Sequence, residues 1–209
     1  MKKTSGRKLN LFNGINEIRK NASSYAKLDI NGNSKSKWNI LILRLLPILF
    51  SVFLVFVLRK NFSFEPKLVA TLLSLFTGLL FGLLLKISDK AILLSEIKTD
   101  NVQDEADVMR EANYLKLFFY FLSYSILVSI CLIIIIIIQS FFSKIMSLNL
   151  NGFIFSDEYS LTTIFTFIKV SIIYFFRFLL IYLIYNFLYF ILLSMVYLYK
   201  YIQFNFSKI

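Results

Sequence analysis

The stretch LFFYFLSYSILVSICLIIIIII, residues 117–138, decides the class of fold. It contains 22 residues without a charged side chain and ends in six consecutive isoleucines. A transmembrane helix needs about 20 predominantly apolar residues, so this stretch is long enough to cross a bilayer. The whole chain agrees, because 58% of its 209 residues are hydrophobic. A soluble domain of this length could not bury so much apolar surface, and we predict an integral membrane protein.

Three further apolar runs bring the predicted number of transmembrane helices to four. Residues 39–58 supply 20 positions, residues 68–85 supply 18, and residues 164–198 supply 35, of which 178–198 carry no charge. The predicted fold class is therefore all-α integral membrane, with a four-helix transmembrane domain over residues 39–198.

The distribution of Lys and Arg gives this domain an orientation. With the N-terminus in the cytoplasm, segments 1–38, 86–116 and 199–209 hold nine, five and two basic residues, whereas the outer segments 59–67 and 139–163 hold three and one. Cytoplasmic loops carry the excess of basic residues, so we predict that both termini are cytoplasmic. The abundance of Phe, Ile, Lys, Asn and Tyr indicates an AT-rich bacterial gene, and the predicted location is a bacterial inner membrane.

The N-terminal segment 1–38 is where the net charge of +11 is concentrated. Its apolar residues recur at helical spacing, which predicts a basic amphipathic helix that lies on the inner leaflet or docks against the rest of the chain. Anionic lipid headgroups are the expected partner, and direct contact with nucleic acid is not expected. The apolar face consists of Leu9, Phe12, Ile15, Ile18, Ala22 and Tyr25.

Residues 86–116 predict a cytoplasmic helical hairpin, the stalk, which extends the second and third spans beyond the membrane. Its first leg keeps apolar residues that a solvated hairpin does not need, and the segment holds seven of the chain's twelve acidic residues. Two interpretations stay open, a docking surface for a cytoplasmic protein partner and a solvated acidic face. The candidate docking residues are Ile92, Leu93, Ile97, Asp100, Asp104, Glu105, Asp107 and Glu111.

Four small residues, each four positions after the last, follow one face of the second span. Helix backbones can approach closely along such a face, and close packing drives helix association in lipid. The face either packs within one chain or joins copies of the chain in a homo-oligomer. We call it the small-residue ladder, and it consists of Ala70, Ser74, Gly78 and Gly82.

Three basic residues fall inside or at the edge of the predicted spans: Arg44, Lys169 and Arg177. Arg44 lies five residues into the first span, and its long side chain can reach the inner headgroups. Arg177 directly precedes the charge-free stretch 178–198, which predicts an anchor at the outer boundary of the membrane. The alternative is a guanidinium that faces the helix bundle, with hydroxyl groups of the third span among its candidate partners.

The fourth span carries polar residues on one face. Hydroxyl and amide groups need hydrogen-bond partners in an apolar medium, so this face should point into the protein. It is either a packing and hydrogen-bonding face or the wall of a wetted pore. The residues are Tyr174, Tyr182, Tyr185, Asn186 and Tyr189.

The sequence lacks the residues of common catalytic and metal sites. Histidine is absent, the single cysteine is Cys131, and no phosphate-binding loop, zinc motif or nucleophile elbow occurs. We therefore predict that the protein is not an enzyme and uses no metal or cofactor. The spans also contain no acidic residue, which counts against ion-coupled transport.

The hairpin KISDKAILLSEIKTDNVQDEADVMREANYLK, residues 86–116, lies between spans two and three of a small four-span protein. This layout resembles the small membrane subunits of bacterial anti-phage operons, and among these the Kiwa membrane subunits. The resemblance implies a homo-oligomer that senses a membrane disturbance and acts with a cytoplasmic partner. We therefore expect an oligomeric sensor or scaffold in the inner membrane. The alternative is a pore-forming effector or an ion channel.

Overall fold

The computed structural model of the protein describes residues 11–28, 36–58, 65–96, 102–142 and 161–207. Within these ranges the chain forms helices and no strand, which confirms the all-α prediction. The helices are α1 (Leu11–Tyr25), α2 (Lys37–Val57), α3 (Pro66–Glu96), α4 (Val102–Phe141) and α6 (Leu161–Phe206).

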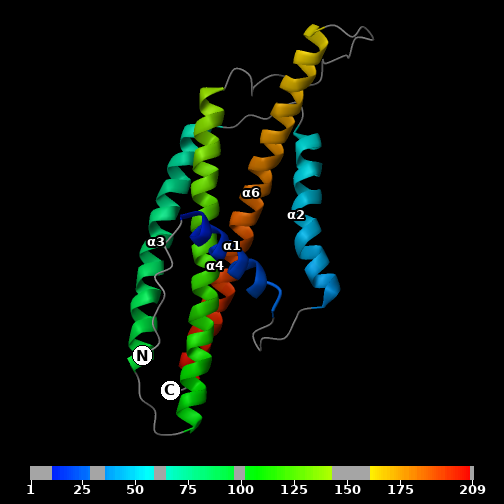
Figure 1. Ribbon diagram of the computed structural model, residues 1–209. Helices are drawn as coiled ribbons and strands as arrows, with labels where there is room; N and C mark the ends of the chain where they lie inside the picture. Colours follow the sequence, from blue (N-terminus) through cyan, green and yellow to red (C-terminus); the bar gives the residue numbers. More distant parts are fainter. Residues whose placement is uncertain (1–10, 29–35, 59–64, 97–101, 143–160, 208–209) are drawn as a thin grey trace.

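The long helices lie side by side in the order α3, α4, α6, α2, as Figure 1 shows from left to right. Helix α4 packs against α3 on one side and against α6 on the other, and α2 packs against α6. The short helix α1 crosses over α4. Because α2 and α3 stand at opposite ends of this row, each leaves a large apolar face outside the protein core.

The contact between α3 and α4 follows a repeat of seven residues on both helices. On α3 the side chains that face the core include Leu73, Leu80, Ile87 and Leu94. Their partners on α4 include Leu115, Leu122, Ser129 and Ile136, all of which are buried. A seven-residue repeat keeps one seam of each helix on its neighbour, as in a left-handed coiled coil, so α3 and α4 stay in contact along almost their whole length.

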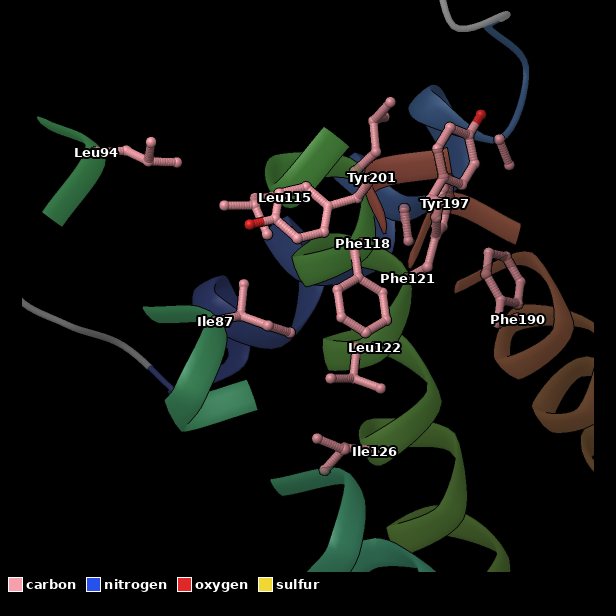
Figure 2. Packing of buried hydrophobic residues seen from close by; sticks show 13 residues of the cluster. Ile87, Leu94, Leu115, Phe118, Phe121, Leu122, Ile126, Phe190, Tyr197 and Tyr201 are labelled. Atoms are coloured by element: carbon pink, nitrogen blue, oxygen red, sulfur yellow. The ribbon is translucent and has the colours of Figure 1, made fainter. Parts of the chain in front are cut away.

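The largest core cluster joins three of these helices near the stalk, as Figure 2 shows. Phe121 of α4 is fully buried, and its ring centroid lies 5.3 Å from that of Tyr197 and 5.9 Å from that of Phe190, both on α6. Ile87 and Leu94 of α3 approach the same cluster from the other side of α4. Aromatic side chains therefore supply most of the packing between α4 and α6 at this level.

Three of the described helices, α3, α4 and α6, are long and apolar enough to cross a membrane. Helix α4 has 40 residues and α6 has 46, or about 60 and 69 Å at 1.5 Å per residue, against a hydrocarbon core of about 30 Å. In α2 the apolar stretch Leu45–Val57 is shorter than a span requires. The structure thus bears out a membrane-type helical protein, and the fourth span stays a prediction.

Helix α6 continues beyond the predicted end of the fourth span. The sequence analysis ended that span at residue 198 and placed a cytoplasmic tail over 199–209, whereas the structure has one unbroken helix, Leu161–Phe206. No Gly or Pro interrupts this stretch, so nothing in the backbone ends the helix earlier. The first residues of the predicted tail therefore form a third helix beside the two legs of the stalk.

Candidate functional site

A cavity of about 400 Å³ lies where α1, α2, α4 and α6 meet. We call it the tyrosine cavity, because three tyrosines from two helices line it. Its polar lining comprises Tyr124 of α4, together with Tyr182, Asn186 and Tyr189 of α6, and Arg19, Ser23 and Lys27 from α1 and the residues that follow it. Its apolar lining comprises Ala26, Pro47, Ile48 and Phe190.

The position of α1 over this cavity follows from a few contacts with α4. Ala22 and Ala26 are buried, and the Tyr25 ring stacks on Tyr120 with a centroid distance of 5.0 Å. The ammonium group of Lys116 lies 5.7 Å from the same Tyr25 ring. Phe12, in contrast, is 76% exposed. The C-terminal half of α1 therefore docks on the protein, whereas the apolar face of its N-terminal half stays exposed.

The predicted polar face of the fourth span is divided between two environments. Tyr182, Asn186 and Tyr189 line the tyrosine cavity, and the side-chain amide of Asn186 donates a 2.8 Å hydrogen bond to the Tyr182 carbonyl. Tyr185 instead contacts Phe50 of α2, with ring centroids 5.6 Å apart. Tyr174 packs against the small buried cluster of Val170 and Ile173. Most of this face thus points toward neighbouring helices.

A polar cluster ties the stalk to the C-terminal end of α6. The Tyr201 hydroxyl donates a 3.0 Å hydrogen bond to Oε1 of Glu111, and the Lys90 ammonium lies 3.8 Å from the same oxygen. That ammonium also lies 5.2 Å above the Tyr201 ring. Glu111 was grouped with the acidic docking residues, but it is buried, with 8% of its surface exposed. Its carboxylate serves the packing of α3, α4 and α6, and it is not available to a partner.

The remaining stalk residues that the structure describes lie on its surface. Ile92 and Leu93 are 56% and 64% exposed. Asp104 and Glu105 are exposed and Asp107 is half-buried, whereas Ile97 and Asp100 lie outside the described residues. The two legs also enclose a groove of about 510 Å³ that Ile87, Ala91, Leu94, Met109 and Ala112 help to line. Apolar side chains of the two legs thus face each other across this groove.

The small-residue ladder of α3 faces away from the rest of the described chain along most of its length. Ala70 is half-buried, but Ser74, Gly78 and Gly82 are exposed. A Cβ atom placed on Gly78 or Gly82 would meet no atom within 4 Å. Among the described residues nothing packs against the two glycines, which favours the second interpretation at these positions. The association between copies stays a prediction.

The three basic residues of the predicted spans differ in their surroundings. Arg177 is buried, with 3% of its surface exposed, and Lys169 is exposed. Arg44 lies in α2, and its side chain is outside the described part of the structure. A headgroup anchor would have a side chain directed out of the protein, so the structure favours the alternative, in which the Arg177 guanidinium faces the bundle.

Two serines of the third span, Ser125 and Ser129, were among the candidate partners of Arg177, and both form hydrogen bonds with other groups. Ser129 and Thr77 share a hydrogen bond of 2.7 Å between their hydroxyl oxygens, which links α4 to α3. Ser125 donates to the carbonyl of Phe121 in its own helix. The Thr77–Ser129 bond lies in the contact between α3 and α4 that follows the seven-residue repeat. This repeat was the sequence signal that could have revealed the pair.

Within the described ranges no group of three or more His, Cys, Asp or Glu side chains is placed to hold a metal ion. Comparison with protein-family models, with curated proteins and with solved structures finds no match. The class that the fold defines is a helical protein with three helices able to cross a membrane.

Proposed function

We propose that the protein is an oligomeric sensor or scaffold of a bacterial inner membrane, which recruits or regulates a cytoplasmic protein through its stalk. The observation that carries the proposal is the continuity of α4 and α6. Both run as single helices from the apolar part of the bundle to the stalk. A rearrangement among the spans is therefore transmitted to the stalk without passing through a flexible joint.

The partner surface in this proposal is the exposed side of the stalk. Ile92 and Leu93 lie beyond the end of the second predicted span at residue 85, and both are more than half exposed. Adjacent exposed apolar residues outside a membrane favour a protein contact. The exposed carboxylates Asp104 and Glu105 lie toward the tip of the same hairpin and favour a partner with a basic rim.

The test is affinity purification of the full chain from the membranes of its native host. The double substitution Ile92→Glu/Leu93→Glu should weaken the binding of the co-purified partner about thirty-fold, since loss of interface anchor residues costs about 2 kcal/mol. Ile202→Glu is the matched control, because Ile202 is 42% exposed on α6 at the same end of the molecule. Equal recovery with both variants would refute the assigned surface.

An anti-phage role is part of this proposal, and the layout of the chain is its support. Cells that carry the chain with its neighbouring genes should form fewer plaques when challenged with phages, and the Ile92→Glu/Leu93→Glu variant should lose this protection. If the variant still protects the cells, the defence role does not depend on the stalk surface.

The alternative proposal is a pore-forming effector or an ion channel, and the polar lining of the tyrosine cavity supports it. The described helices of one chain stand in a row (Figure 1), so copies of the chain would complete a conducting path of which the tyrosine cavity forms part. Purified protein in liposomes should then pass ions, and Tyr182→Phe should alter the conductance. Electrically silent liposomes with the protein fully inserted would exclude this alternative.

A further inference from the structure

We propose that the tyrosine cavity binds the phosphate of an anionic phospholipid. This site is independent of the sensor proposal, because it lies between helices of one chain and does not involve the stalk surface. The charge of the lining, its hydrogen-bond donors and its position along the predicted spans all favour this ligand.

The charge of the lining favours an anion. Arg19 and Lys27 contribute two positive charges, and no carboxylate belongs to the lining. Arg19 is exposed and Lys27 is half-buried, so both can reach a ligand at the mouth of the cavity. Cations beside apolar surroundings are stabilised by a counter-charge, and a bound phosphate would supply one to both residues.

The neutral part of the lining offers donors to phosphate oxygens. The hydroxyls of Tyr124, Tyr182 and Tyr189 come from two facing helices, and the Asn186 amide has a second N–H beyond the one bound to the Tyr182 carbonyl. Hydrogen bonds from neutral groups to a charged acceptor are stronger than those between neutral groups. The cavity therefore combines charge with directional donors.

The position of the cavity favours a lipid over a soluble anion. Tyr124 lies seven residues inside the predicted start of the third span, and Pro47 lies eight residues inside that of the first. Tyr189 lies nine residues before the predicted end of the fourth span. All three thus lie about two to two and a half helical turns from the inner boundary. Pro47, Ile48 and Phe190 supply the apolar wall that acyl chains require.

The sequence of α1 fits this role. Arg19 and Ser23 are four residues apart in α1, which places them on one helix face, and Lys27 follows four residues later, just after the helix ends at Tyr25. The contacts of Tyr25 and Ala26 with the protein hold that face over the cavity. Basic pockets between transmembrane helices on the cytoplasmic side are typical binding sites for anionic headgroups.

The test is a titration of the purified full chain with phosphatidylglycerol or with phosphatidylcholine, followed by native mass spectrometry. The anionic lipid should bind more tightly than the zwitterionic one. Arg19→Gln and Lys27→Gln should each weaken its binding about five-fold, because one basic residue near a headgroup contributes about 1 kcal/mol. Lys20→Gln is the matched control, since Lys20 neighbours Arg19, is exposed and does not line the cavity.

A second pair of variants tests the donors without a change of charge. Tyr189→Phe should weaken phosphatidylglycerol binding, whereas Tyr199→Phe should not, because Tyr199 is 65% exposed and outside the cavity. Equal affinity for the two lipids, or an equal loss with Lys20→Gln, would overturn the proposal. Competition by millimolar inorganic phosphate would overturn the assignment to a lipid.

Discussion

At the scale of single residues, the buried Glu111 carboxylate shows how the stalk is held together. One of its oxygens accepts a hydrogen bond from Tyr201 and lies near the Lys90 ammonium, so three helices meet at one acidic group. A buried carboxylate is stable only with such compensation, because burial removes its hydration. The cluster therefore fixes the register of α6 against the stalk.

A double-mutant cycle on Glu111 and Tyr201 tests this role. Tyr201→Phe should lower the free energy of unfolding by about 1 kcal/mol, because it removes the hydroxyl donor. Glu111→Gln should lower it by about 1–3 kcal/mol, because it removes the charge that strengthens this hydrogen bond and attracts Lys90. The double variant should lose less than the sum of the two, as expected for groups in direct contact. Tyr199→Phe is the control with an exposed ring, and strictly additive losses would contradict the contact.

Arg177 shows what the sequence cannot determine at this scale. The charge-free stretch 178–198 predicted where Arg177 lies along the helix. It did not predict to which side of the helix the Arg177 side chain points. An amphipathic pattern reveals which side of a helix faces the core, but in α6 large apolar side chains occur on every side, beside the polar face that begins at Tyr174. The rotation of such a helix is set by its neighbours, and these are known only from the packed structure.

At the scale of helices, length and composition predicted more than orientation did. The charge-free runs 68–85 and 117–138 lie within α3 and α4. The predicted fourth span ends at residue 198, but α6 continues as a helix to Phe206. Tyr201 lies in this continuation, so the boundary of the span did not reveal its contact with Glu111.

The small-residue ladder gives a prediction for the helix that carries it. Gly78→Leu combined with Gly82→Leu should leave the fold of one chain intact, because both positions face open space. Helix propensity should even favour the change, since Gly in a helix interior costs about 1 kcal/mol relative to the best helix formers. The same change should block close approach of a second α3 and reduce the oligomer.

Crosslinking in native membranes measures the oligomer, and thermal unfolding in detergent measures the fold. Leu79→Phe is the control, because it enlarges the exposed side chain next to Gly78 without filling the ladder. An unfolded double variant would show that the ladder packs within one chain. A chain that is monomeric before any substitution would remove the basis for the homo-oligomer.

At the scale of the whole molecule, the open question is whether α2 crosses the membrane. Three crossings put the two chain ends on opposite sides, and four put them on the same side. Reporter fusions at residues 1, 63, 105, 150 and 209 should read in, out, in, out, in, because the excess of basic residues favours cytoplasmic ends. Identical readings at residues 1 and 63 would show that α2 does not span.

The unbroken course of α6 has a mechanical consequence. A helix of 46 residues without Gly or Pro acts as a stiff lever that runs from its first turn to the stalk. A tilt of about 5° about its first turn would move its far end by roughly 6 Å, given a length of about 69 Å. A change in bilayer thickness alters the tilt of spanning helices. The lever would convert that change into a displacement of Tyr201 and of the stalk bound to it.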